Sequence, residues 1–293
     1  MGSLDRRPVP ISTALEHALI LFGFSVVAGV VGSMLGLGGG IVIIPVLTLL
    51  FGVSAREAIG ASIVSVIATS SGAAAAYVRD GLSNIRVGMF LEIATTVGAI
   101  LGAFLAALFA PSVLYIIFGL MLAYSALAML QNRHVEIPDV PESHPLAKRL
   151  RFAGSYHDDV LGQDIPYNVA NPYGGLLMMW VAGLMSGLLG IGSGLFKVLA
   201  LDVFMKMPLK VSTATSNFMI GVTAAASAGV YFARGDILPV IAAPVALGVL
   251  AGATLGTRVM VRFRNRTLRY VFLPVLLIMA AEMIIRGVTG GGA

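Results

Sequence analysis

Long apolar segments recur along the whole chain and are separated by short polar turns. In the first half they predict helices over residues 14–35, 40–52, 57–78, 87–109 and 112–130. In the second half they predict helices over residues 173–189, 195–206, 210–232, 238–257 and 267–286. A helix needs about 20 apolar residues to cross the hydrocarbon core of a bilayer, and most of these segments reach that length. The pattern therefore predicts an all-α, polytopic membrane protein.

The second segment of each half is short, and each follows a cluster of glycines. Residues 36–40 read Gly-Leu-Gly-Gly-Gly, and residues 190–194 read Gly-Ile-Gly-Ser-Gly. A helix as short as residues 40–52 reaches only about 20 Å, less than the roughly 30 Å of the hydrocarbon core. Each short segment therefore either begins inside the bilayer and completes a crossing or forms a re-entrant stub. Glycine adopts positive φ readily, which allows a helix to stop and restart.

The two halves of the chain are related by a shift of 154 residues. Under that shift these residues fall on identical ones: Gly36 on Gly190, Gly38 on Gly192, Gly40 on Gly194, Ser62 on Ser216 and Thr69 on Thr223. A register kept without gaps over this length indicates an internal duplication. Two inverted repeats of about five helical segments each are expected, which is a common plan among secondary transporters.

Composition supports a membrane location and excludes several other classes. Charged residues make up 11% of the chain and hydrophobic residues 58%, whereas a soluble protein carries about a quarter charged residues. The absence of cysteine excludes disulfides, thiolate metal sites and cysteine nucleophiles. The basic balance does not indicate nucleic-acid binding, because nearly all Lys and Arg lie between apolar segments, where they orient the protein and meet anionic lipid. The first segment carries Glu16 and His17 and is interpreted as a retained helix rather than a signal peptide.

The distribution of Lys and Arg favours the layout in which the short segments complete a crossing. With five crossings per half, thirteen basic residues collect on one face and five on the other, whereas four crossings divide them ten against eight. The positive-inside rule then predicts a multi-pass protein of the inner membrane, with the polar linker cytoplasmic and both termini outside. The predicted organisation is a tail at 1–13, a repeat at 14–130, the linker at 131–172, a second repeat at 173–286 and a tail at 287–293. One short surface helix is expected around Leu146–Phe152.

The glycine clusters are candidate binding elements. A helix that restarts inside the bilayer points unpaired N–H groups and a positive dipole end at the membrane interior, which favours an anion. The candidate substrate-binding residues here are Gly38, Gly39, Gly40, Gly192, Ser193 and Gly194. The alternative is close helix packing. Packing is the preferred interpretation for Gly98, Gly102, Gly252 and Gly256, which lie in mid-helix.

Lys197 is a charged residue within the short second-half segment, three positions after Gly194. The first half has Ile43 there. An ammonium beside a helix start would strengthen the attraction for an anion, and charges within the membrane indicate function by default. The alternatives are a lysine that extends to the interface or one that pairs with Asp202.

Other polar residues add candidate contacts. Ser62, Ser216 and Asn217 can donate hydrogen bonds to an oxyanion without adding net charge, although helix capping and helix–helix bonding are equally open for them. Glu92 lies inside the fourth segment and is a candidate proton-coupling group. Its register mate is Ala246, so the duplication does not support this role. The alternatives for Glu92 are a partnership with Arg86 or an interfacial position.

Enzymatic functions receive no support from the sequence. An intramembrane hydrolase needs a Ser–His pair or two facing carboxylates inside the bilayer, and neither is evident. The phosphate-binding pattern G-x-x-x-x-G-K-[ST] does not occur. The four histidines cannot form one metal site by their spacing. The sequence therefore predicts neither catalysis nor a metal or cofactor.

The glycine motifs resemble those of a known family. Residues 32–47, Gly-Ser-Met-Leu-Gly-Leu-Gly-Gly-Gly-Ile-Val-Ile-Ile-Pro-Val-Leu, are similar to the hallmark of the sulfite exporter TauE/SafE family of anion permeases, as is the echo at residues 187–196. The resemblance covers nearly the whole chain. It implies a permease for a small sulfur-containing anion such as sulfite, sulfoacetate or another organosulfonate. Ser193, Lys197 and Leu199 depart from the family pattern, which leaves the particular anion open.

Three functions remain open at this point. The preferred one is a secondary transporter that binds its anion at two broken-helix starts near the bilayer midplane and moves it by alternating access. A channel-like or cation-coupled permease would use the unwound carbonyls instead. A membrane scaffold would use the glycines for packing alone. The expected partners are a small anion and the lipid bilayer, and a homo-oligomer is left open.

Overall fold

The computed structural model describes residues 11–36, 38–47, 51–53, 55–105, 142–189, 193–233, 235 and 237–289, with isolated positions between 112 and 130. About half of the predicted helix over 112–130, and Gly192 of the candidate site, lie outside the described residues.

The described chain is mostly helical, and most of the apolar segments form helices with bounds close to those predicted. The segment predicted over 40–52 is helical to Leu47, and its end at residues 51 and 52 is not helical. The first half contains α1 (Ile11–Leu35), α2 (Gly40–Pro45), α3 (Ala55–Arg79) and α4 (Ile85–Leu105). The second half contains α7 (Pro172–Leu189), α8 (Gly194–Leu199), the π-helical turn η2 (Ala200–Phe204), α9 (Leu209–Ala233), α10 (Pro239–Met260) and α11 (Asn265–Val288). A shift of 154 residues places the first residues of α2, α3 and α4 on those of α8, α9 and α10.

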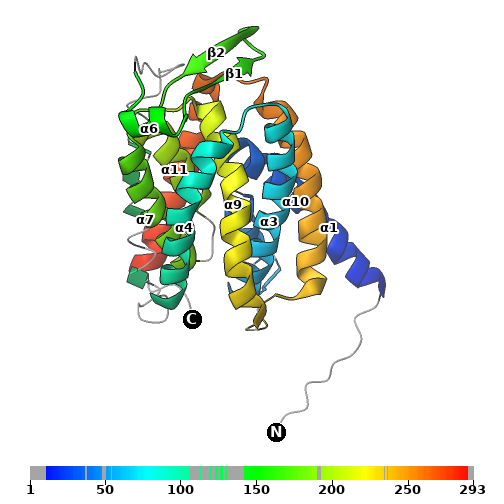
Figure 1. The fold of residues 1–293 in the computed structure, drawn as a ribbon. Coiled ribbons are helices and arrows are strands. Elements are labelled where there is room, and N and C mark those ends of the chain that lie inside the picture. The colour runs from blue at the N-terminus through cyan, green and yellow to red at the C-terminus, as the bar shows by residue number, and fades with distance from the viewer. Residues whose placement is uncertain are drawn as a thin grey trace.

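Three helices in the described part of the chain are long and apolar enough to cross a membrane. They comprise Gly60–Arg79 within α3, Ile85–Gly102 within α4 and Pro239–Met260, the whole of α10. The helices stand roughly side by side, with α1 along α10, α4 along α7, and α3 beside α9 at the centre (Figure 1).

Glycines in mid-helix allow the two outer helix pairs to approach closely. A Cβ atom added to Gly98 of α4 would lie 2.2 Å from the carbonyl oxygen of Trp180, and one added to Gly252 of α10 would lie 2.0 Å from that of Val26. Trp180 and Val26 are themselves 154 residues apart, so the same contact occurs in both pairs. The packing interpretation of these glycines is confirmed.

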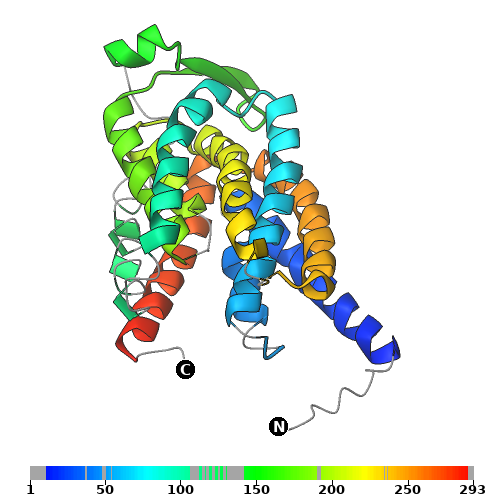
Figure 2. The same ribbon diagram turned by 60° about the horizontal axis from the view of Figure 1, so that its bottom comes forward.

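The two broken helices enter the bundle from opposite ends. The N–H group of Ala170, just before α7, bonds to the carbonyl oxygen of Met205, just after η2, at 3.0 Å. The excursion α7–α8–η2 therefore begins and ends at one end of the bundle. In the first half, Leu47 after α2 lies in one buried cluster with Leu21 of α1 and with Ala58 near the beginning of α3. That excursion begins and ends at the other end of the bundle (Figure 2).

The linker corrects the prediction of an all-α protein. It contains the expected short helix, α6 (Pro145–Arg149), but also an antiparallel hairpin of β1 (Gly154–Asp158) and β2 (Gln163–Tyr167). Tyr156 and Ile165 face each other in the hairpin and are buried. Short strands with a buried residue between exposed ones form because their side chains alternate between two faces. The hairpin lies at the end of the bundle opposite to the beginning of α1 and the end of α11 (Figure 1).

Hydrogen bonds attach the linker to the helix ends beneath it. The Nζ atom of Lys210, in the first turn of α9, lies 3.0 Å from a carboxylate oxygen of Asp158 and 3.2 Å from the carbonyl oxygen of Val261. Asn84, before α4, donates through Nδ2 to the carbonyl oxygen of Phe152 at 2.8 Å and to the hydroxyl of Tyr167 at 2.9 Å. The linker is thus a folded cap over one end of the bundle.

Candidate functional site

The two glycine clusters meet inside the bundle at Ser216. Its Oγ atom lies 3.1 Å from the carbonyl oxygen of Gly36 and 3.2 Å from that of Gly194. Ser216 is fully buried on α9. The carbonyl group of Gly36, just after α1, has no partner within that helix, and the same hydroxyl also reaches Gly194 at the beginning of α8. Ser216 is therefore placed at the predicted site, but its donor is used by backbone.

The backbone of the first break has a conformation that glycine adopts more readily than other residues. Gly36, Gly38 and Gly39 have φ values of 69°, 73° and 72°, which other residues adopt at a cost. A Cβ atom on Gly38 would lie 3.0 Å from Val66 of α3 and 3.2 Å from Ile220 of α9. Val66 and Ile220 are register mates in the middle of their helices. The break therefore lies at the centre of the bundle, between the two halves.

The helices that follow the breaks begin in this interior. α2 begins at Gly40 and continues through two π-helical residues to Leu47, and α8 continues through η2 to Phe204. The first N–H groups of a helix have no intrahelical partner and carry the positive end of its dipole. Gly38, Gly39, Gly40, Ser193 and Gly194 are all buried. Two positive helix starts thus lie in the protein interior.

Several buried oxygens around the breaks have no hydrogen-bond partner among the described residues. They are the Oγ atoms of Ser62 and Ser193, Oγ1 of Thr213 and Oδ1 of Asn217. Buried polar atoms are normally paired, and an unpaired one costs about 1–3 kcal/mol. The three hydroxyls can donate to an oxyanion. Among the described residues, no group uses this donor capacity.

The side-chain amide of Asn217 makes the helix–helix bond that was considered as an alternative to anion binding. Its Nδ2 atom donates to the carbonyl oxygens of Ser33 at 2.9 Å and of Thr213 at 3.1 Å. Both amide N–H groups are therefore used, and the free Oδ1 atom is an acceptor. Asn217 holds the end of α1 against α9 and does not offer a donor to an anion.

Lys197 and Glu92 form an ion pair inside the bundle. The Nζ atom of Lys197 lies 3.1 Å from Oε2 of Glu92 and 2.5 Å from Oγ1 of Thr223, and that hydroxyl lies 2.5 Å from Oε1 of Glu92. The side chains of Lys197 and Glu92 are 0% and 8% exposed. Glu92 lies seven residues after the beginning of α4, about 10 Å along the helix, so the pair is far from both ends.

The pairing corrects the alternatives considered for each residue. Lys197 does not extend to the interface. Arg86, considered as a partner of Glu92, donates instead to the carbonyl oxygen of Arg151 in the linker at 3.1 Å. Under the 154-residue shift, Lys197 and Glu92 correspond to Ile43 and Ala246. The charged pair joins the two halves and has no charged counterpart at the matching positions, and Thr223 is a functional candidate that the sequence alone did not single out.

Other hydroxyls of the central helices bond within their own helix. Ser65 donates to the carbonyl oxygen of Ser62 at 2.7 Å, and Thr69 to that of Ser65 at 2.8 Å. Such bonds to the preceding turn satisfy a hydroxyl locally. These residues are not available to a ligand in this arrangement.

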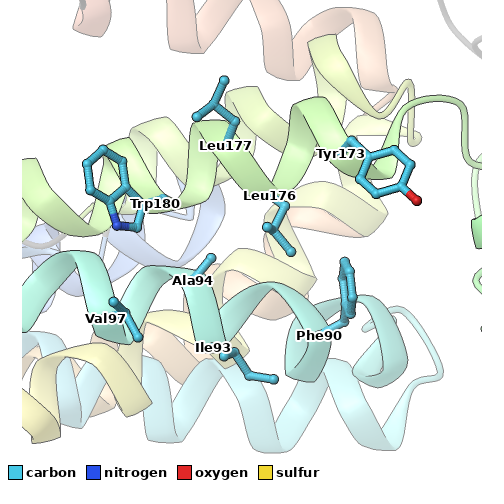
Figure 3. A pocket seen from close by; sticks show the side chains of 8 residues that line it. All are labelled: Phe90, Ile93, Ala94, Val97, Tyr173, Leu176, Leu177 and Trp180. Carbon is cyan, nitrogen blue, oxygen red and sulfur yellow. The ribbon is translucent and has the colours of Figure 1, made fainter.

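An apolar groove on the outside of the bundle is unsuited to an anion. It has a volume of about 480 Å³ and lies between α4 and α7, lined by Phe90, Ile93, Ala94, Val97, Tyr173, Leu176, Leu177 and Trp180 (Figure 3). Ile93 and Leu177 are largely exposed. A surface of this kind suits hydrocarbon, and it turns away from Glu92 on the same helix.

An apolar helical bundle with two broken helices that meet around buried polar groups has the build of a membrane transporter. The sequence profile described as sulfite exporter TauE/SafE matches residues 21–283. The chain belongs to the sulfite exporter TauE/SafE family, and its resemblance to that family is confirmed.

Named relatives share this class over most of their length. The probable membrane transporter protein YunE of Bacillus subtilis is 27% identical over 277 residues, which cover 92% of this chain and 98% of the relative. The probable membrane transporter protein MJ0441 of Methanocaldococcus jannaschii is 24% identical, with 91% and 94% covered. A probable membrane transporter protein of Xylella fastidiosa is 27% identical, with 85% and 87% covered. Comparison with solved structures gives no significant match.

Proposed function

We propose that this transporter moves a small sulfur-containing anion, such as sulfite, sulfoacetate or another organosulfonate, across the inner membrane. The anion binds near the bilayer midplane, between the starts of α2 and α8. The observation that carries the proposal is the convergence of both breaks on Ser216, inside the protein. Two helix dipoles there favour negative charge.

The residues proposed to contact the anion follow from which groups are free. The hydroxyls of Ser62, Ser193 and Thr213, which have no partner among the described residues, are the side-chain donors. The N–H groups of Gly38, Gly39, Gly40 and Gly194, at the beginnings of α2 and α8, are proposed as the backbone donors. Lys197 supplies a positive charge in α8, whose N-cap residue is Ser193. Ser216 and Asn217 position the breaks rather than the ligand.

The two halves are proposed to be inverted repeats that exchange access to the site between the two faces of the membrane. The excursions α1–α2 and α7–α8–η2 enter from opposite ends of the bundle, as inversion requires. The Lys and Arg distribution supports a cytoplasmic position for the capped end. Rocking of the halves about a central site is the usual mode of such transporters.

Flux into proteoliposomes tests the function. Purified protein is reconstituted, and uptake of labelled sulfite and sulfoacetate is followed with sulfate and chloride as competitors. The proposal predicts saturable uptake of at least one sulfur anion, weakened in Lys197→Met. Uptake that is absent for every sulfur anion would show that the substrate class is wrong.

A cation-coupled permease is a second candidate, favoured by one observation. The free Oδ1 atom of Asn217 is a buried acceptor, and acceptors suit a cation such as sodium. If sodium is coupled, replacement of sodium by choline would abolish uptake. If the anion alone or a proton is coupled, the replacement would leave uptake unchanged.

A further inference from the structure

Lys197, Glu92 and Thr223 form a closed set in which each charged group already has a partner. The ammonium contacts the Glu92 carboxylate and the Thr223 hydroxyl, and that hydroxyl contacts the second carboxylate oxygen. The net charge of the set is zero. In a buried place, one uncompensated charge costs several kcal/mol.

This neutrality limits how an anion can use Lys197. An anion that pairs with the ammonium displaces the Glu92 carboxylate and leaves it buried without a partner. The site then carries one extra negative charge in an apolar bundle, which is strongly unfavourable. A proton on Glu92 removes that charge.

We propose that Glu92 takes up one proton from water as the anion binds to Lys197, so that each anion is accompanied by a proton. The inference rests on the proposed function. Before binding, the set holds an ammonium and a carboxylate. After binding, it holds an ammonium, the anion and a neutral carboxyl group, in which a new O–H bond has formed. The buried charge is zero in both states for a monoanion.

Thr223 is suited to both states. Its hydroxyl donates to the carboxylate when Glu92 is charged, and it also lies 3.3 Å from the carbonyl oxygen of Met219 one turn earlier. When Glu92 becomes a carboxylic acid, the acid donates to Thr223 and the threonine proton turns to Met219. The proton of the carboxylic acid and the proton of the threonine hydroxyl therefore each have an acceptor in the bound state.

Few other charged groups reach this place. α7, packed against α4, carries no charged residue. On α9, Lys210 pairs with Asp158 of the hairpin. Asp202 lies in η2, five residues beyond Lys197, and Arg86 on α4 bonds to the linker. Among the described residues, Lys197 is the charged group in direct contact with Glu92.

Calorimetry with purified protein counts the protons directly. Binding of methanesulfonate, which stays ionised at neutral pH, is measured in buffers of different ionisation enthalpy. The wild-type protein is expected to take up about one proton per anion, and its affinity to fall about tenfold per unit rise in pH. Glu92→Gln is expected to bind at least as tightly with no proton uptake. The Lys197→Ile/Glu92→Ala variant, which carries the residues found at the two matching positions, is expected to bind far more weakly.

The outcomes separate this inference from the proposed function. Wild-type binding without proton uptake would overturn the inference and leave anion transport in place. So would a Glu92→Gln protein that keeps the wild-type pH dependence. Absence of both binding and flux for methanesulfonate, sulfite and sulfoacetate would overturn both. The wild-type proton count needs no variant, so a poorly folded variant does not prevent the test.

Discussion

The ammonium of Lys197 lies 3.1 Å from the carboxylate of Glu92, although the residues are 105 positions apart and belong to different halves of the chain. The two residues replace the apolar Ile43 and Ala246 found at the matching positions. The ion pair thus occurs at two positions whose counterparts in the duplicated fold carry apolar side chains. Each residue alone would be an isolated charge in the bundle.

The pairing predicts opposite effects for single and double substitutions. Lys197→Met or Glu92→Gln removes one partner and should destabilise the protein by about 3–5 kcal/mol. Lys197→Ile/Glu92→Ala removes both charges and should recover most of that loss. Thermal unfolding midpoints in detergent measure the comparison. A double variant as unstable as the sum of its parts would show that the ion pair is not the cause.

Thr223 has a matched control in its register mate, Thr69. Both hydroxyls bond to the preceding turn, but only Thr223 also contacts Glu92 and Lys197. Thr223→Val should therefore cost about 1–3 kcal/mol more than Thr69→Val, because it leaves charged groups short of a partner. Unfolding midpoints and anion flux provide the readout, and equal effects would contradict the assigned role.

Alanine substitutions at Gly38 and Gly81 distinguish the cost of steric crowding from the cost of backbone strain. Both have positive φ, at 73° and 69°, but a Cβ atom on Gly38 meets Val66 and Ile220, whereas one on Gly81 meets nothing within 4 Å. Gly81→Ala should cost only the strain, about 1–2 kcal/mol. Gly38→Ala should cost more and abolish flux, since the central break must move. Flux retained in Gly38→Ala would show that this break does not shape the site.

Because the hairpin is attached to the bundle through Asp158 and Lys210, the folded linker should lose stability in acid. Burial raises the pKa of Asp158, but the hydrogen bond and charge of Lys210 and the N–H groups of Val160 and Leu161 outweigh burial and lower it overall. A carboxyl group with a lowered pKa stabilises the fold above its unfolded value, about 3.9, and this stabilisation is lost as the pH falls through the folded value. Proteolysis within the linker should therefore increase below about pH 4.

Asp159 provides the control for this prediction, since it is an exposed neighbour in the same turn. Asp158→Asn should make the linker sensitive to proteolysis at neutral pH, because the linker loses on the order of 3 kcal/mol of stability. Asp159→Asn should leave the linker resistant to proteolysis. Identical digestion of the two variants would show that the bond to Lys210 does not hold the hairpin.

The helices were predictable from sequence because each is an apolar segment bounded by polar or glycine residues. The duplication gave a second, independent indication of where the corresponding helices begin. The hairpin was missed because its alternation spans five residues per strand, around Tyr156 and Ile165. The short pattern was read as loop within a polar segment that contains several prolines.

The sequence predicted that the two glycine breaks meet, and ligand binding there stays a prediction. Ser216 and Asn217 were considered as donors to the anion. The carbonyl groups at the end of α1 need donors from outside the helix, and Ser216 and Asn217 donate to those of Gly36 and Ser33. The pair of Lys197 and Glu92 depends on how α4 packs against the second half, which local spacing does not reveal. Their partners were therefore sought among sequence neighbours, Asp202 and Arg86.

Cysteine labelling tests most directly whether the anion binds where the two breaks meet. The chain contains no cysteine, so Ser62→Cys, Ser193→Cys and Thr213→Cys each introduce a single thiol, with Ser155→Cys, at an exposed position of the hairpin, as control. We predict that a small anionic methanethiosulfonate reagent labels the three buried positions and that methanesulfonate slows this labelling, with no slowing at position 155. Three buried thiols that stay unlabelled, or labelling that methanesulfonate slows equally at all four positions, would contradict the account.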